Sequence, residues 1–401
     1  MTQKYPDKNA AIVIELGVNG LGAVRSLGKL GIEVIGVYTE EGAGCYSKYC
    51  RPLEFPKIAV DEEGFKAQLI ALCSSLAKPP VLFPTSDQSV SFISRHRNEL
   101  AKHALFSLPD TETLDKIINK DGTFELASSC GVTIPATHVP ATMNDVRSIA
   151  EQINFPVIFK PNDTFSGLLP GNAKNITFRT KEEMLGFFDA NPACADKGVL
   201  QEIIWGGDGY IYVCAGYFNR SGDPLALYTG RKIRQHLPDY GVTCCGESVY
   251  VPELIQVSTD FMKKLNYWGL ASVEFTRDRK TGKYYFLEIN ARSYYHNSLF
   301  LTCGINLPYA AYQDIVSGGS VEVPKQKQKE GIIWIDFDRD VGSFWRKFKK
   351  GELGFGEWIG SVVRARSFGV FAADDWGPFR YNTMHLGKVI LHKIVGGING
   401  K

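Results

Sequence analysis

The first forty residues carry the pattern that most restricts the fold. In "AAIVIELGVNGLGAVRSLGKLGIEVIGVYTE", residues 10–40, an apolar strand, a glycine-rich turn, a short helix ending at Gly31 and a second apolar strand follow one another. This order is typical of a parallel βαβ unit. A helix over 62–77 and the strand "PVLFPTSD" continue the alternation. We therefore predict a Rossmann-like, doubly wound α/β domain over residues 1–115.

Residues 116–318 show a different pattern, which predicts a second, α+β domain. A helix runs to Gly131, and the strand "FPVIFKP" precedes a loop rich in Gly, Asn and Ser. Turn residues then separate four strand-like segments, "GVLQEIIW", "YIYVCAGYF", "ASVEFTRD" and "KYYFLEIN". This spacing predicts a mostly antiparallel sheet. Residues 319–401 form a C-terminal extension whose role the pattern does not specify, with one expected strand, "GIIWIDFD".

Composition excludes several classes of function. The chain has 401 residues, 44% of them apolar, which is enough for two or three packed units. A net charge of +2 gives no reason to expect a nucleic-acid partner. No apolar stretch is long enough for a membrane span, and the first residues do not resemble a signal peptide. Nine cysteines without a CxxC pair suit reduced thiols, so we expect a cytoplasmic protein without a zinc site.

The segment "YYFLEINARSYYHN", residues 284–297, ends an apolar strand with three polar residues. Because side chains alternate along a strand, Glu288 and Asn290 point to the same side. Glu274 lies on the preceding strand, so a hairpin would bring its carboxylate beside them. Three hard oxygen ligands suit Mg²⁺, with Mn²⁺ as a substitute. Such a metal also takes ligands from the phosphates of a substrate, and Arg292 would face those phosphates. A solvated strand end is the commoner outcome for any one of these residues, but their combined spacing favours a metal site.

Further residues suit a nucleotide. Lys160 ends the strand "PVIFK" beside an open loop and can reach phosphate, whereas Lys120 precedes a helix, where lysines are usually solvated. The segment "VLQEIIWGGDG" supplies the adenosine candidates, which are the carboxylates of Glu202 and Asp208 and the backbone of Ile203 and Ile204. In "TGRKIRQ", Arg231, Lys232 and Arg234 form either a basic strand face or a triphosphate clamp.

Taken in order, these motifs resemble the ATP-grasp superfamily over residues 1–318. Within it, "GVNGLGAVRSLGKLGIEV", "LFPTSDQSV", "GRKIRQHLPDYG" and "LEINARSYYHNSL" look most like stand-alone carboxylate–amine ligases, a branch that includes D-aspartate ligases. The resemblance implies an ATP-grasp fold preceded by a Rossmann-like domain, with ATP and Mg²⁺ as cofactors. One departure is that the loop after Lys160 has Gly167 and Gly171 but lacks the dense glycine cluster of many members.

The resemblance also implies a role for each candidate residue. Lys120, Lys160 and Lys232 would bind ATP phosphates, and Glu202, Ile203, Ile204 and Asp208 would hold adenosine. Glu274, Glu288 and Asn290 would hold Mg²⁺, while Arg292 and Arg231 would act on the acyl phosphate. The implied reaction has two steps. A carboxylate attacks the γ-phosphate of ATP, and an amine then displaces phosphate from the acyl phosphate.

Other interpretations compete with this one. The "GVNGLG" turn lacks the middle glycine of a dinucleotide fingerprint, which disfavours an NAD-dependent oxidoreductase. A non-catalytic nucleotide-binding protein and an ATP-dependent carboxylase remain alternatives. Thr85, Ser86 and Asp87 would either bind the carboxylate substrate or begin a helix. His296 would either act as a base toward the amine or be a hydrogen-bonded structural histidine.

The C-terminal extension carries one further hypothesis. "SFWRKFKKGELGFGEWIG" and "HLGKVILHKIVGG" mix aromatic and aliphatic residues with Lys and Arg. A surface that makes peripheral contact with a membrane has this composition. Aromatic residues at helical spacing more often pack a small core, with lysines reaching water. Small-molecule carboxylate and amine substrates are the other expected partners, and an oligomer is compatible with the sequence.

Overall fold

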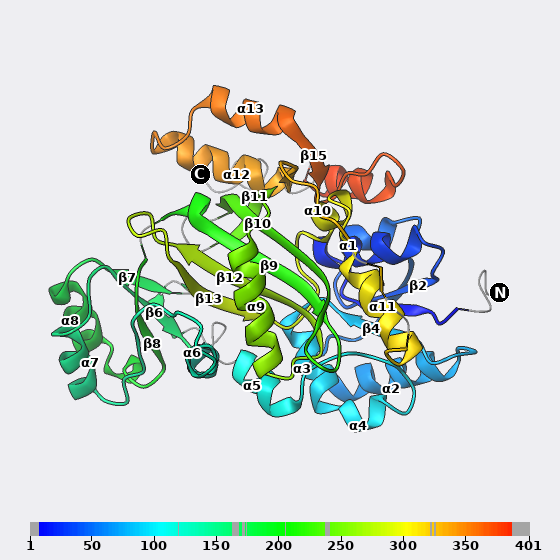
Figure 1. Cartoon of the computed structure of the whole chain (residues 1–401), viewed down its shortest axis with the longest axis horizontal. Coiled ribbons are helices and arrows are strands. Elements are labelled where there is room, and N and C mark those ends of the chain that lie inside the picture. Colours follow the sequence, from blue (N-terminus) through cyan, green and yellow to red (C-terminus); the bar gives the residue numbers. More distant parts are fainter. Residues whose placement is uncertain are drawn as a thin grey trace, which may run out of the picture.

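A computed structural model describes residues 8–118, 120–162, 168–170, 173, 175–204, 206–236, 241–320, 323–324 and 326–386. The described elements form three sheets with helices packed against them (Figure 1). Gly167, Gly171 and most of "HLGKVILHKIVGG" lie outside the described residues, as does the side chain of Lys120. No helix in the described part of the chain is both long and apolar enough to cross a membrane.

The N-terminal sheet is parallel and has the strand order β3-β2-β1-β4. Its strands are β1 (Ala11–Ile14), β2 (Val34–Tyr38), β3 (Arg51–Glu54) and β4 (Val81–Pro84). The helices are α1 (Val18–Gly28), α2 (Glu62–Ser74), α3 (Asp87–Arg95) and α4 (Arg97–Leu100), with the short 3₁₀ helix η1 (Ala43–Tyr46). All residues of β1 and β4 are buried, as expected for strands of a parallel sheet that is covered on both faces. The predicted doubly wound arrangement is confirmed.

Two helices, rather than the single one expected, lead into the next part of the chain. They are α5 (Thr111–Ile118) and α6 (Lys120–Ser129). Gly122 lies so close to α5 that an added Cβ would sit 2.9 Å from the Cα of Lys116. The chain therefore turns back on itself here, and the local helical pattern of the sequence does not reveal that reversal.

A small sheet of order β5-β8-β6-β7 stands to one side of the molecule (Figure 1). Its strands are β5 (Thr137–His138), β6 (Val157–Pro161), β7 (Ile176–Phe178) and β8 (Gly198–Glu202). The helices α7 (Met143–Ala150) and α8 (Lys181–Ala190) bury a separate core with it, and the 3₁₀ helix η3 (Pro192–Cys194) precedes β8. The strand "GVLQEIIW" is antiparallel to its neighbours as expected, but it pairs with β5 and β6 in this small sheet rather than with the other three predicted strands.

The central sheet has the order β13-β12-β9-β10-β11-β14-β15 and is antiparallel except for its last pair. Its first five strands in chain order are β9 (Ile211–Phe218), β10 (Pro224–His236), β11 (Val242–Ser248), β12 (Gly269–Arg277) and β13 (Tyr284–Asn290). Around it lie η4 (Asp208–Tyr210), α9 (Pro252–Lys264), α10 (Asn297–Thr302) and α11 (Leu307–Ser317). One core joins the N-terminal domain to this sheet, since Ile12 and Phe92 belong to the same buried cluster as Phe275.

The chain after residue 318 continues the central sheet. It contributes β14 (Ile333–Ile335) and β15 (Ala365–Phe368), with α12 (Phe337–Lys349) and α13 (Phe355–Arg364) between them. β14 pairs with β11, and the buried Trp334 packs against the core around β1. β14 and β15 thus belong to the same sheet as the predicted metal ligands. The domain boundaries at 115 and 318 stay predictions.

Candidate functional site

The hairpin of β12 and β13 places Glu274 directly opposite Glu288, as the strand spacing predicts. A register shift follows Glu274, between it and Phe275. The turn of the hairpin is closed by Asp278, whose carboxylate accepts the backbone amides of Lys280 and Thr281. Two carboxylates therefore face each other on neighbouring strands.

The carboxylate of Glu274 is held at both oxygens. Lys232 on β10 approaches one oxygen to 2.6 Å, and the hydroxyl of Tyr294 donates to the other at 2.6 Å. All three residues are buried. Sequence reasoning missed Tyr294, although it lies within the "SYYHN" motif, because a tyrosine after a strand is usually a core residue. Glu274 is fixed in one orientation by residues from two other segments.

Protein surrounds most of the Glu288 carboxylate, but part of the residue is exposed to solvent. Its pKa is raised, first because the surrounding protein removes water from the carboxylate and second because Glu274 is near. The charges of Lys232 and Lys160 and a hydrogen bond from Asn290 oppose this rise in pKa. The residue nevertheless keeps an exposed surface. A carboxylate with protein around it and one side open is accessible to a ligand.

Arg292 connects this pair of strands to the N-terminal domain. It donates to the side-chain oxygen of Asn290 at 3.0 Å and to the carboxylate of Asp87 at 2.6 Å. Asp87 begins α3, directly after Ser86, which caps that helix in a capping box with Ser89. Of the two interpretations of this segment, a substrate site or the start of a helix, the second is therefore confirmed for Ser86.

Lys160 reaches the site from the small sheet. Its ammonium group donates to Gln201 at 2.8 Å and lies 5.3 Å from the centre of the Phe124 ring. Its charge also acts on Glu288, which places the two residues in the same neighbourhood. The helix α6 begins at Lys120.

The groups predicted to bind adenosine make more contacts within the protein than the sequence suggests. The amide of Ile203 donates to the carbonyl of Pro156 at 3.0 Å, so the expectation that its backbone is exposed was wrong for this amide. In the described part of the chain, the Ile204 amide has no such partner. Both carboxylate oxygens of Asp208 bind the chain itself, through Gln235 and through Lys347 of α12 at 2.9 Å. Glu202 is half-buried at the end of β8.

The basic segment of β10 is divided among three acids. Arg231 pairs with Glu247 on β11, Lys232 with Glu274 on β12, and Arg234 with the fully buried Asp340 on α12, each at 2.6–2.9 Å. A clamp of three cations on one triphosphate is therefore not formed. Alternation along the strand and the register shift after Lys232 send neighbouring side chains to different partners.

The "GVNGLG" turn is filled by packing. The amide of Asn19 donates to the carbonyls of Thr85 and Ser293, both at 2.7 Å. A Cβ at Gly22 would lie 2.6 Å from the Cβ of Asn297, and one at Gly20 would lie 2.0 Å from the oxygen of Glu15. Gly22 therefore allows close contact between the N-terminal domain and α10, and Gly20 allows the turn to pack against the backbone of Glu15.

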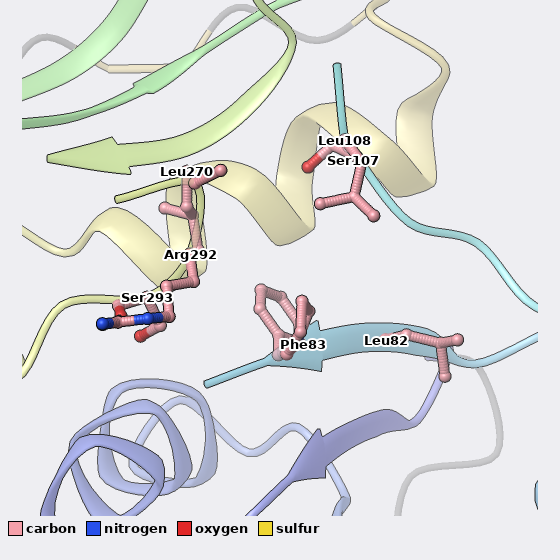
Figure 2. A pocket seen from close by; sticks show the side chains of 9 residues that line it. Leu82, Phe83, Ser107, Leu108, Leu270, Arg292 and Ser293 are labelled. Carbon is pink, nitrogen blue, oxygen red and sulfur yellow. The ribbon is translucent and has the colours of Figure 1, made fainter. Parts of the chain in front are cut away.

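A small cavity lies where β4 meets the ends of β12 and β13 (Figure 2). Phe83, Leu270 and Arg292 are among its lining residues, and its volume of about 10 Å³ is roughly that needed for one water. A larger cavity of about 390 Å³ lies between η1 and the helix over 377–386. It contains none of the predicted site residues.

The donor set fits Mg²⁺ by its chemistry. Glu274, Glu288 and Asn290 offer hard oxygen atoms. Burial first and repulsion from Glu274 second raise the pKa of Glu288, and a cation between the two carboxylates would relieve that repulsion. Among the described residues, no three His, Cys, Asp or Glu side chains are grouped closely enough to hold a metal. The expected set has two acids and an amide, so the asparagine and the nucleotide phosphates would complete the coordination.

Comparison with solved structures identifies the fold. The biotin carboxylase domain of 2-oxoglutarate carboxylase from Hydrogenobacter thermophilus, determined with MgADP, has a TM-score of 0.62 and 16% identity, over 82% of this chain and 74% of that one. N5-carboxyaminoimidazole synthetase from Staphylococcus aureus also has a TM-score of 0.62, with 13% identity, over 87% and 88%. The fold is the ATP-grasp fold. The predicted fold class is confirmed.

Two further similarities concern ligases with this fold. L-amino acid ligase from Bacillus licheniformis has a TM-score of 0.58 and 17% identity, over 79% of this chain and 77% of that one. D-aspartate ligase from Enterococcus faecium is 26% identical over 259 residues, which is 61% of this chain and 60% of that protein. The matched region is thus less than two thirds of the curated relative. No family model matches the chain.

Proposed function

We propose that this ATP-grasp protein is an ATP-dependent ligase that joins a carboxylate to an amine and releases ADP and phosphate. The observation that carries the proposal is the contact of Lys232 with Glu274, which lies opposite Glu288 across the hairpin. Lys160, from the small sheet, acts on Glu288 through its charge. Cations for phosphate and opposed acids for a metal are what phosphoryl transfer requires. The similarity to a D-aspartate ligase and to an L-amino acid ligase supports amino-acid-like substrates.

In the proposed mechanism, the side chains neutralise charge and position the reacting groups. Lys160 and Lys232 stabilise the negative charge that develops on the phosphates as the carboxylate attacks. Arg292, fixed between Asn290 and Asp87, faces the acyl phosphate while the amine approaches. Bound Mg²⁺, held by Glu274, Glu288 and Asn290, would neutralise phosphate charge. Tyr294 keeps Glu274 oriented for this role.

The other predicted residues receive narrower roles. We assign Lys120 to the phosphates, and Ile204 and Glu202 to adenosine. Asp208 instead joins η4 to α12 through Lys347. Arg231 is paired with Glu247 at a partly exposed position. It can bind phosphate only if this ion pair breaks. A carboxylase-type reaction is the second candidate, because biotin carboxylase domains share the fold.

A substrate screen tests the proposal. Purified protein is incubated with ATP, Mg²⁺ and pools of amino acids, and both phosphate release and coupled products are measured. We expect phosphate release that requires a carboxylate and an amine together, with a new C–N product by mass. Release that instead depends on bicarbonate alone would favour the carboxylase reaction, and no dependence on any pool would contradict the ligase.

We also propose peripheral membrane contact through the outer side of α12 and α13. Part of the aromatic sequence packs a small core, in which Phe344, Leu353 and Trp358 are buried. Five large apolar residues remain exposed beside it, namely Trp345, Phe348, Phe355, Ile359 and Val363. Basic residues lie among them in sequence, including Arg346, Lys349, Lys350, Arg364 and Arg366. An apolar stripe with flanking cations is complementary to an anionic lipid surface.

Sedimentation with vesicles of anionic and neutral lipid tests this contact. Val363→Asp should reduce binding to anionic vesicles, because it places a charge in the apolar stripe. Val60→Asp, at an 81% exposed position of the N-terminal domain, is the matched control. Equal binding by both variants, or none by the unaltered protein at low salt, would contradict membrane contact. A cytoplasmic location, which suits the nine free thiols, and oligomer formation stay predictions.

A further inference from the structure

We propose that Asp87 is the binding site for the positively charged amino group of the amine substrate. The inference rests on the proposed ligase function and deepens it, because it assigns a substrate class, an ammonium-bearing amine, to a residue of the N-terminal domain. The other predicted acids have different assignments: Glu274 and Glu288 would hold the metal, Glu202 would hold adenosine, and Asp208 pairs with Lys347.

The first support is the order of contacts around Arg292. On one side, its guanidinium donates to Asn290, which itself donates to Glu288. On the other side, it donates to Asp87. The guanidinium thus separates the metal and phosphate side from the N-terminal domain. An amine that attacks an acyl phosphate held at Arg292 must approach from a direction not occupied by ATP, and Asp87 lies on that side.

The second support is the accessibility of the carboxylate. The side chain of Asp87 is 64% exposed, whereas that of Arg292 is 20% exposed. Only one oxygen of Asp87, Oδ1, accepts from Arg292, and the described residues offer no partner to the other. An exposed ion pair of this kind contributes little to stability. The carboxylate therefore has an open oxygen beside a reactive centre.

The third support is that the backbone around this carboxylate is fixed. Ser86 caps α3 through Ser89, and the hydroxyl of Thr85 donates to the carbonyls of Ile14 and Glu15. The loop therefore holds Asp87 in place without using its carboxylate. Figure 2 shows Arg292 and Ser293 beside β4, the strand that leads into this loop. The position is also the carboxyl end of a parallel strand at the point where the strand order reverses, where ligands bind in open α/β sheets.

The paired charges indicate the ligand class. A carboxylate with one open oxygen recognises an ammonium group, and the neighbouring guanidinium recognises a carboxylate or phosphate. Together they fit an amine that carries its positive charge at the reacting nitrogen, such as an amino acid. In the ligation, this nitrogen forms the new C–N bond while the C–O bond to phosphate breaks. The bound ammonium group first loses one proton to solvent, which frees the lone pair that forms the bond, and the second proton goes to the leaving phosphate.

A comparison of two nucleophiles tests the proposal with the full-length protein. The amino-acid pool supplies carboxylates in both arms. In one arm its own amines are the acceptors, and in the other arm hydroxylamine is added, which is uncharged at neutral pH and needs no ammonium site. Coupled products are measured by mass and hydroxamate by its iron complex. Asp87→Asn should lower amine coupling roughly 10- to 100-fold, the range for losing a charged hydrogen bond, and leave hydroxamate formation within about twofold.

Matched variants exclude indirect effects. Asp223→Asn removes an exposed acid paired with Lys263 and should change neither product. Asp87→Glu keeps the charge and should recover part of the amine coupling. Equal loss of both products in Asp87→Asn would show that Asp87 acts only by positioning Arg292, and unchanged coupling would show a surface ion pair only. Either result overturns the inference. If the unaltered protein forms neither product, the proposed ligase function itself is wrong.

Discussion

Two buried ion pairs lie two residues apart on β10, and their surroundings differ. Arg234 donates to both oxygens of Asp340 and to the hydroxyl of Ser361, and Trp358 donates to the same carboxylate. Lys232 pairs with Glu274, which faces a second acid, Glu288, across the hairpin. The charges around Asp340 are matched by fixed donors, whereas the region around Glu274 contains two opposed carboxylates.

The difference separates a structural contact from a binding site. A buried charge pair whose hydrogen bonds are all made holds elements together, here β10 with α12 and α13. Two opposed acids, of which one is partly open to solvent, hold a cation more readily than they stabilise a fold. We therefore propose that the same strand serves packing at Arg234 and ligand binding at Lys232.

The largest expected effect is on catalysis at the open acid. Glu288→Gln should lower ligation on the order of 10³-fold, because it removes a charged metal ligand of similar size. Removing the repulsion from Glu274 should leave the unfolding temperature unchanged or higher. Asn290→Ala should also abolish turnover. Product formation and thermal unfolding are measured on the same samples, and near-normal turnover in either variant would contradict the metal assignment.

The next effect is on stability at the closed pair. Arg234→Ala leaves Asp340 buried without its cation and should lower the free energy of unfolding by about 3–5 kcal/mol. Arg147→Ala, which breaks an exposed pair with Asp189, should cost less than about 1 kcal/mol. Urea unfolding compares the two variants. A small loss at Arg234 would mean that α12 and α13 do not depend on this contact.

A third variant separates nucleotide binding from metal binding. Lys160→Ala should weaken ATP affinity roughly 10- to 100-fold, because a charged contact with phosphate is lost while the hairpin acids stay in place. Lys181→Ala, an exposed lysine of the same small unit that pairs with Glu151, is the control. Calorimetric titration with ATP measures both. Unchanged affinity would limit Lys160 to its contact with Gln201.

The effect that is smallest near neutral pH concerns His296, which is buried near Lys232. Burial first, and the Lys232 charge second, lower the pKa of His296 to about 3, so the ring is neutral near pH 7. The unfolded chain binds this proton near pH 6.5, so stability falls as pH decreases from about 6.5 toward 3, by up to about 1.4 kcal/mol per pH unit. His296→Gln removes this contribution. Its stability relative to the unaltered protein should rise as the pH falls, and parallel urea-unfolding curves would refute it.

Local patterns predicted the order of the elements and the face of the sheet on which each side chain lies. Alternation along "YYFLEIN" and the length of the turn "DRKTGK" placed Glu288 opposite Glu274, because a hairpin joins residues that are near in sequence. The Rossmann-like domain follows from the spacing of its strands and Gly31. Local patterns failed where the chain reverses within a helical stretch, as at Gly122, and where a strand joins a distant sheet, as β8 does.

The sequence by itself thus determined the strands, the ATP-grasp resemblance and the candidate acids. Only the tertiary structure decided the partners of those residues. Arg292 meets Asp87 across 205 positions, and Asp208 binds a lysine of α12 rather than being left open. Strand periodicity fixes the face on which a side chain lies, but a partner from another sheet depends on how the sheets pack. For that reason, Tyr294 and the continuation of the central sheet beyond residue 318 became visible only in the fold.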